Sequence, residues 1–98
     1  MTKEKDWYLY IIQCKDNSLY TGISVDVQKR FREHVEQTPK CAKYLRGRQP
    51  LTLVFIALVG EKSQALKMEN VVKKLSKRAK LKLIHSKKAE LALFSLLD

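Results

Sequence analysis

The sequence predicts an α+β domain whose elements follow the order strand, strand, helix, strand, helix, helix. Two short runs rich in aromatic and β-branched residues, 8–14 and 19–23, predict the first two strands. A longer apolar run at 51–59 predicts the third strand, and neighbouring segments carry apolar residues at helical spacing. With 98 residues, of which 45% are hydrophobic, the chain has enough apolar residues for one core and little room for a second.

The first two strands are expected to form a hairpin. Residues 15–17, Lys-Asp-Asn, lie between them, and Asp and Asn side chains readily close a backbone turn. Tyr10 lies in the first strand and Tyr20 in the second. Gly22, near the end of the second strand, allows other atoms to approach the backbone closely or permits a positive φ angle.

A helix is expected directly after the hairpin. Either Ser24 or Asp26 can cap its first turn, because both side chains accept hydrogen bonds from free backbone N–H groups. Val27, Phe31 and Val35 recur at every fourth position and form an apolar stripe. This stripe predicts that one side of the helix packs against the sheet.

Arg30 and His34 lie four residues apart on this helix, one helical step from the apolar stripe. We therefore expect them together at the margin of the sheet. Thr38 is expected to end the helix, because proline disfavours the helical conformation in the residue before it. Residues 40–48 then form a basic loop or a short helix. Its cationic side chains are Lys40, Lys43, Arg46 and Arg48, with Tyr44 among them.

The third strand follows Pro50 and covers residues 51–59. It is an almost continuous apolar run, which is typical of a central strand covered on both faces. Gly60 is expected to end it. The sequence therefore predicts that this strand lies inside the sheet.

Two helices and a helical tail are expected after the third strand. Ser63 is a plausible N-cap of the first, and Glu69 lies near the edge of its buried face. That buried face comprises Ala65, Met68, Val72 and Leu75. The next helix is expected near 79–84, and the apolar tail at 89–97 docks on the core or on another copy of the chain.

The chain carries a formal net charge of +10, from 20 Lys and Arg against 10 Asp and Glu. Such a surface attracts polyanions, of which nucleic acid is the commonest. No apolar run approaches the roughly 20 residues that span a bilayer, and the charged N-terminus does not resemble a secretory signal, so a cytoplasmic protein is expected. Cys14 and Cys41 are expected as free thiols, because two thiolates alone do not fill a zinc site.

Five residues together suggest phosphodiester chemistry. Arg30 can contact a phosphate through two parallel hydrogen bonds, and Glu69 can hold a hard divalent cation. Tyr10, Tyr20 and His34 can orient or deprotonate a water molecule. Each also has a structural alternative: a tyrosine in a strand is more often a packed aromatic, and a helical glutamate is more often an exposed ion pair.

In order along the chain, these residues resemble the GIY-YIG nuclease superfamily. The segments 8–10 (Tyr-Leu-Tyr) and 20–22 (Tyr-Thr-Gly) stand where that family has Gly-Ile-Tyr and Tyr-Ile-Gly. Arg30 and Glu69 fall at the positions of its helix arginine and its metal-binding glutamate. Residues 42–50 resemble the basic loop of its small single-domain branch, which is grouped with SLX-type structure-specific nuclease domains.

The resemblance implies a small three-stranded antiparallel sheet flanked by helices over residues 1–85, with 86–98 as a helical tail. It also implies metal-dependent cleavage of DNA, possible protein partners that supply specificity, and Mg²⁺ or Mn²⁺ held by Glu69. The resemblance further implies that Tyr10 and Tyr20 line the site and that Arg30 stabilises phosphoryl charge. It also implies that His34 assists proton transfer or water placement. The chain departs from the family pattern at Tyr8, which replaces a glycine, and at Thr21.

Two functions are therefore expected. The first is a metal-dependent endonuclease, structure-specific or of low specificity, acting on branched or nicked DNA in repair or recombination. The alternative is a non-catalytic module that binds nucleic acid through phosphate contacts. The cationic residues expected to contribute are those of the basic loop (Lys40, Lys43, Arg46 and Arg48) together with Lys73, Lys74, Lys77, Arg78, Lys80 and Lys82, with Lys73 and Lys77 the main helical candidates.

Overall fold

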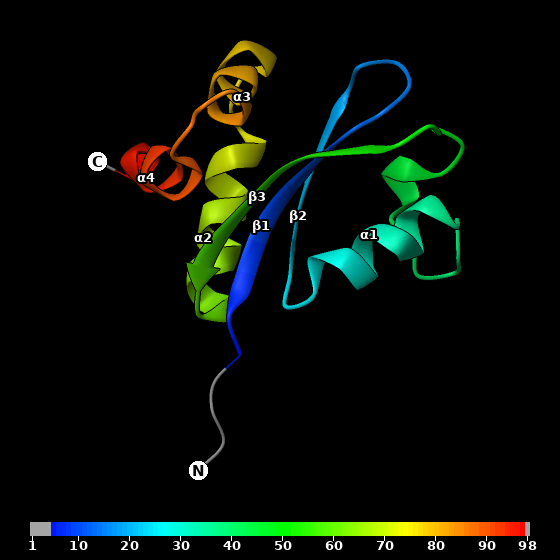
Figure 1. Cartoon of the computed structure of the whole chain (residues 1–98), viewed down its shortest axis with the longest axis horizontal. Coiled ribbons are helices and arrows are strands. Elements are labelled where there is room, and N and C mark those ends of the chain that lie inside the picture. Colours follow the sequence, from blue (N-terminus) through cyan, green and yellow to red (C-terminus); the bar gives the residue numbers. More distant parts are fainter. Residues whose placement is uncertain (1–4, 98) are drawn as a thin grey trace.

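A computed structural model describes residues 5–97 of the chain. Three strands form one antiparallel sheet: β1 (Trp7–Gln13), β2 (Leu19–Ser24) and β3 (Thr52–Gly60), in the spatial order β2-β1-β3. Helix α1 (Val27–Val35) lies on one face of this sheet. Helices α2 (Lys62–Lys73), α3 (Lys77–Ile84) and α4 (Ala89–Phe94) gather on the other face (Figure 1). The predicted α+β fold with a three-stranded antiparallel sheet is confirmed.

Strand β1 is the centre of the molecule because it pairs with both neighbours. Successive side chains of a strand point to opposite faces, so β1 supplies both layers of the core. Leu9 and Ile11 face the α2 side, whereas Tyr10 and Ile12 face the α1 side. All four are buried.

Each face of the sheet has its own buried cluster. The cluster on the α2 side is apolar and comprises Leu9, Ile11, Phe55, Ala57, Val59, Ala65, Met68, Val72, Leu83 and Leu93. The cluster on the α1 side is smaller and comprises Tyr10, Ile12, Cys14, Val27, Cys41 and Leu45. Both cysteines are therefore buried free thiols, as expected.

The prediction that the third strand is central was wrong. β3 is an edge strand, and its burial alternates, with Ile56 39% exposed and Leu58 38% exposed. An apolar run therefore did not require cover on both faces here. Part of the edge is closed by α4, because the N–H of Leu58 donates to Oε1 of Glu90 at 3.4 Å.

Several helix ends differ from the expectation. Asp26 caps α1, accepting from the N–H of Lys29 at 3.1 Å, and α1 ends at Val35 rather than at Thr38. Gln37 has a φ of 55°, which is incompatible with a right-handed helix, so the helix has already ended before Pro39. Glu61, not Ser63, caps α2.

The Glu61 cap is reciprocal: the Glu61 side chain accepts from the N–H of Gln64, and Oε1 of Gln64 accepts from the N–H of Glu61 at 3.1 Å. Two short 3₁₀ turns complete the fold: η1 (Lys43–Leu45) in the basic loop and η2 (Ser95–Leu97) after α4. Residues 40–48, expected as a basic loop or a short helix, form a loop that contains the three-residue turn η1. In the described part of the chain, no helix is both long and apolar enough to cross a membrane.

The tail folds back onto the core. Leu93 of α4 is fully buried in the cluster on the α2 side, where α4 lies against β3. Leu91 and Leu97 of the same segment remain exposed. One face of α4 is thus part of the domain, and the other is open.

Candidate active site

The residue pair Tyr10 and His34 forms the centre of the α1 face. Both side chains are buried, His34 completely, and Oη of Tyr10 lies 3.0 Å from Nε2 of His34. The backbone N–H of Ala42 donates to Nδ1 of His34 at 3.3 Å. Because Nδ1 accepts, Nε2 carries the proton of the neutral ring and donates it to Tyr10. The hydroxyl hydrogen of Tyr10 therefore remains available for another acceptor.

Gly22 makes room for the Tyr10 ring. These two residues are paired across β1 and β2, and a Cβ on Gly22 would lie 2.5 Å from both Cζ and Oη of Tyr10. Only a residue without a side chain allows the ring to lie there. The close approach expected at Gly22 is thus the feature that positions the phenol.

Burial sets the protonation states of this group. Burial raises the pKa of Tyr10 well above its ordinary value, the neighbouring Tyr20 adds to the rise, and Arg30 opposes it. The pKa of Tyr20 is raised by burial and lowered by Arg30. Burial and the nearby Arg30 charge lower the pKa of His34 to about 4, and Glu33 opposes this shift. At neutral pH the two phenols are protonated and the imidazole is neutral.

Arg30 supplies the positive charge beside the phenols. Its Nη1 donates to Oε1 of Glu33 at 3.2 Å and to the carbonyl of Lys40 at 2.6 Å. These bonds hold the guanidinium in place, and its side chain stays 30% exposed. A hydrogen bond between the Arg30 and Tyr10 side chains contributes to the effect of Arg30 on the pKa of Tyr10.

Glu69 of α2 influences the same group through its charge. Its carboxylate raises the pKa of both Tyr10 and Tyr20, although it pairs with Nζ of Lys73 at 3.6 Å. Within residues 5–97 there is no group of three His, Cys, Asp or Glu side chains that could hold a metal. A single carboxylate is still compatible with Mg²⁺, which keeps several waters and is completed by substrate phosphate.

A stack of rings extends from this group to the surface. The Tyr20 ring lies 6.4 Å from Tyr10 and 5.8 Å from His34, and it stacks on Tyr44 at 5.9 Å with an interplanar angle of 26°. Cζ of Arg48 lies 4.4 Å from the centre of the Tyr44 ring. The buried phenols are thus connected to an exposed aromatic residue.

A match to a known protein family covers the segment that contains Tyr10, Tyr20, Arg30, His34 and Glu69. Residues 6–82 match the family described as the GIY-YIG catalytic domain. The chain belongs to the GIY-YIG family. This is a nuclease-type domain, and a nucleic-acid substrate is implied.

The chain is also similar to proteins of two named bacteria. The UPF0213 protein YhbQ of Salmonella typhimurium is 52% identical over 92 residues, which cover 94% of this chain and 90% of that protein. The UPF0213 protein of Citrobacter koseri is 54% identical over 78 residues, covering 80% of this chain and 76% of that protein.

Two solution NMR structures resemble this GIY-YIG domain. The UPF0213 protein BH0048 from Bacillus halodurans is 38% identical, with a TM-score of 0.54, and the match covers 95% of this chain and 97% of that one. Protein EF2693 from E. faecalis is 31% identical, with a TM-score of 0.57, covering 87% and 92%.

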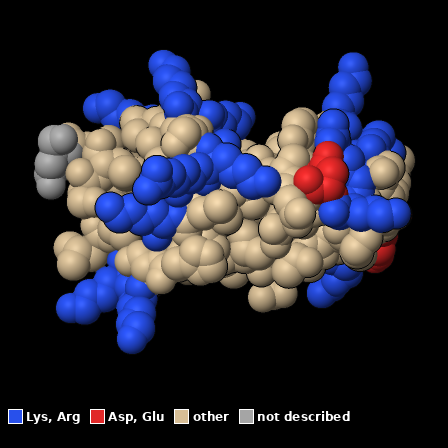
Figure 2. Space-filling model, turned by 90° about the horizontal axis from the view of Figure 1, so that it is seen from above, with Lys and Arg blue, Asp and Glu red and all other residues tan. Residues whose placement is uncertain are grey.

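On the face of the GIY-YIG domain that Figure 2 shows, Lys and Arg side chains form several patches, and few Asp or Glu side chains are visible. Four of the predicted nucleic-acid contacts have partners within residues 5–97. Arg46 donates to the carbonyl of Thr38 at 2.8 Å, and Arg48 pairs with Asp16 at 2.7 Å. Lys40 lies 3.9 Å from Glu33, and Lys73 lies 3.6 Å from Glu69. The other two candidates, Lys43 on η1 and Lys77 on α3, are exposed.

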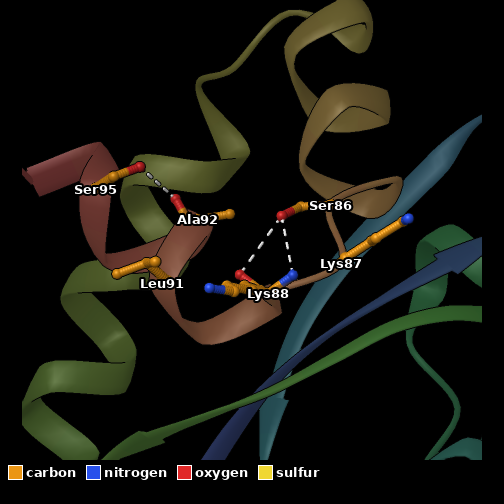
Figure 3. A pocket seen from close by; sticks show the side chains of 6 residues that line it. All are labelled: Ser86, Lys87, Lys88, Leu91, Ala92 and Ser95. Carbon is orange, nitrogen blue, oxygen red and sulfur yellow. Dashed lines mark hydrogen bonds between the residues drawn. The ribbon is translucent and has the colours of Figure 1, made fainter.

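A hollow between α3 and α4 is not part of this site. Figure 3 shows its lining, in which Oγ of Ser86 accepts from the N–H of Lys88 at 3.3 Å and Oγ of Ser95 donates to the carbonyl of Ala92 at 2.7 Å. The hydroxyls are already paired within the chain. None of the predicted catalytic residues lines this hollow.

Two contributors to the site were not among the predicted site residues. Gly22 had a signal in the sequence, since a glycine in a strand often marks a close approach. The N–H of Ala42 had none, because a backbone donor from a loop leaves no mark on residue identity. Gln37 brings that loop into place by donating to the carbonyls of His34 and Leu45 at 2.7 and 3.3 Å.

Proposed function

We propose that this protein is a metal-dependent endonuclease that hydrolyses DNA phosphodiester bonds, with structure-specific or low-specificity cleavage in DNA repair or recombination. The observation that supports it most is the oriented phenol of Tyr10, which is held by neutral His34 over Gly22 and lies beside Arg30. A buried tyrosine with only a packing role needs neither a dedicated glycine nor a nearby guanidinium.

In this proposal, Arg30 binds the phosphoryl oxygens at which negative charge develops. The Tyr10 hydroxyl, with its hydrogen free, holds the attacking water or a phosphoryl oxygen by a hydrogen bond. His34 is buried and does not reach the substrate, so it acts by orienting Tyr10. Tyr20 forms the neighbouring wall. Glu69 would hold Mg²⁺ or Mn²⁺, which when bound supplies positive charge for the leaving oxygen.

The protonation state of Tyr10 determines whether its phenol can act as the general base. Because the pKa of Tyr10 is raised in the free protein, the phenol is a weak source of phenolate at neutral pH. Positive charge brought by the cation lowers that pKa and favours the ionised form. His34, with Nε2 donating, stabilises a Tyr10 phenolate through the same hydrogen bond.

The experiment is incubation of the purified protein with nicked, flapped and branched DNA, with and without Mg²⁺. Metal-dependent cleavage is expected, and it should be lost in Glu69→Gln. Full activity in Glu69→Gln would point to a contaminating nuclease. No cleavage of any of these substrates by the wild-type protein would contradict the proposal.

The second candidate is a nucleic-acid-binding module without catalysis. The raised pKa of Tyr10 and the pairing of Glu69 with Lys73 favour it. It predicts binding without cleavage in the presence of metal. Its affinity for duplex DNA should fall with salt by about 0.9 log unit per log unit for each phosphate neutralised.

A further inference from the structure

A pocket of about 390 Å³ opens at the free edge of β2. Its volume is within the range of roughly 300–1,000 Å³ that is typical of small-molecule sites. Its lining comes from β2, η1, α2 and α3, and comprises Leu19, Tyr20, Thr21, Tyr44, Lys73 and Lys80. Tyr20 is shared with the candidate active site, so the two are adjacent.

One wall of the pocket is aromatic. Tyr44 is 42% exposed, and its ring stacks on Tyr20. Both tyrosines line the pocket. Arg48, which also contacts the Tyr44 ring, lies outside the lining. An exposed tyrosine held in one orientation is a suitable surface for stacking a nucleobase.

The other wall is cationic. Lys73 comes from α2, where its Nζ also pairs with Glu69 at 3.6 Å, and Lys80 comes from α3. Within residues 5–97 Lys80 has no ion-pair partner. Oγ1 of Thr21 is buried and has no hydrogen-bond partner among the described residues. Two lysines and two tyrosines that line one pocket match the two parts of a nucleotide, its phosphate and its base. Inorganic phosphate alone would leave the aromatic wall unexplained.

We propose that this pocket is a subsite for one unstacked nucleotide, with its base on Tyr44 and its phosphate between Lys73 and Lys80. Its place next to the scissile phosphate rests on the proposed function, because Tyr20 forms a wall of both sites. A base that stacks on Tyr44 is no longer stacked or paired within the DNA duplex. The substrate must therefore contain an unpaired nucleotide at this position, as at a flap, at a branch or in a single strand.

The test uses short single-stranded oligonucleotides that carry 2-aminopurine at successive positions, in EDTA so that no cleavage occurs. Stacking on an aromatic ring quenches the fluorescence of this base, and we expect quenching when the wild-type protein binds. Tyr44→Leu should lose the quenching and bind about 5- to 100-fold more weakly, the range for one base–aromatic stack. Tyr44→Phe should keep both.

The cationic wall is tested in the same assay. Lys80→Ala should weaken binding and reduce the salt slope by about 0.7, the value for one phosphate contact on a single strand. Lys67→Ala, with the same charge change at an exposed position of α2 outside the pocket lining, should keep the quenching. A folded Tyr44→Leu variant that binds and quenches like the wild type would overturn the proposal, as would equal losses in Lys80→Ala and Lys67→Ala.

The two proposals fail separately in these experiments. Quenching that depends on Tyr44, without cleavage in Mg²⁺, would overturn the nuclease function and keep the subsite. Cleavage in Mg²⁺ without any dependence of binding on Tyr44 would overturn the subsite and keep the nuclease function.

Discussion

The two faces of the sheet share the central strand but differ in chemistry. On the α2 face, β1 contributes Leu9 and Ile11 to a cluster that is wholly apolar. On the α1 face, the intervening Tyr10 meets buried His34. Because successive β1 side chains point to opposite faces, apolar packing lies on one side of the sheet and the Tyr10–His34 pair on the other. We therefore expect substitutions on the α2 face to change stability and substitutions on the α1 face to change activity.

The difference in buried groups has an energetic consequence. Apolar burial on the α2 face stabilises the fold with no requirement for directed partners. A buried imidazole and phenol instead stabilise it only while each is hydrogen-bonded, because an unpaired buried polar group costs about 1–3 kcal/mol. Burying the His34 imidazole and the Tyr10 phenol on the α1 face therefore carries a risk to stability that packing alone does not explain.

The largest expected effect is that of Tyr10→Phe on cleavage. Loss of the hydroxyl should lower the rate by about 10²- to 10⁴-fold, the range for a group that handles a proton in the transition state. The unfolding free energy should also fall by about 1–3 kcal/mol, because Nε2–H of His34 loses its acceptor. Single-turnover cleavage and chemical denaturation measure the two.

Tyr8→Phe is the matched control for Tyr10→Phe. Tyr8 lies on the same strand and the same face, partly buried, and its hydroxyl makes no hydrogen bond within residues 5–97. It should cleave at the wild-type rate. Equal losses in the two variants would remove the special role of Tyr10.

On the α2 face, Leu93→Ala should act on stability alone. Truncating a fully buried leucine costs about 2–5 kcal/mol, which denaturant titration measures. Leu91→Ala, on the exposed side of the same helix, should change the unfolding free energy by less than about 0.5 kcal/mol. If folded Leu93→Ala lost cleavage as Tyr10→Phe does, the separation of the two faces would be wrong.

Gly22→Ala should affect both properties. The new Cβ would overlap the Tyr10 ring, so the phenol must move. A displacement of about 1 Å can cost on the order of 10²-fold in rate. Overpacking also typically costs about 1–3 kcal/mol in stability. A wild-type cleavage rate in this variant would show that the position of the Tyr10 ring is not important.

A further expected effect concerns pH. His34 has a folded-state pKa of about 4, below the ordinary value of about 6.5, so the unfolded chain binds more protons between these values. Its contribution to stability is therefore complete above about pH 6.5 and is lost as the pH falls toward 4. His34→Gln should flatten the pH dependence of the unfolding free energy in that window.

His85, exposed at the C-terminus of α3, provides the control for that pH experiment. His85→Gln should leave the wild-type pH dependence in place. If His34→Gln kept the full dependence, the buried neutral imidazole would not be its source.

Local signals predicted much of this fold, and long-range contacts explain what they missed. The hairpin, the α1 stripe and the position of Arg30 and His34 follow from short-range patterns. The edge position of β3 does not, because an apolar run reports burial and not strand order. The end of α1 depends on Gln37, whose side chain is held by the basic loop, and no local pattern shows that contact.

The candidate site shows the same division. The spacing of Arg30 and His34 places both beside the sheet, but spacing does not determine which nitrogen of His34 carries the proton. That depends on the N–H of Ala42, eight residues away. In the same way, Tyr44 was predicted only as a residue of a basic loop, and its stack on Tyr20 requires the loop to fold back over β2.

The most direct test of the central claim compares Arg30→Ala with Arg32→Ala in single-turnover cleavage of flapped DNA with Mg²⁺. Both variants lose one positive charge from the same helix, but only Arg30 influences the buried phenols. We expect the cleavage rate to fall by about 10²- to 10³-fold in Arg30→Ala and to stay near the wild-type rate in Arg32→Ala. Equal rates in the two variants would contradict a phosphodiester-cleaving site on the α1 face.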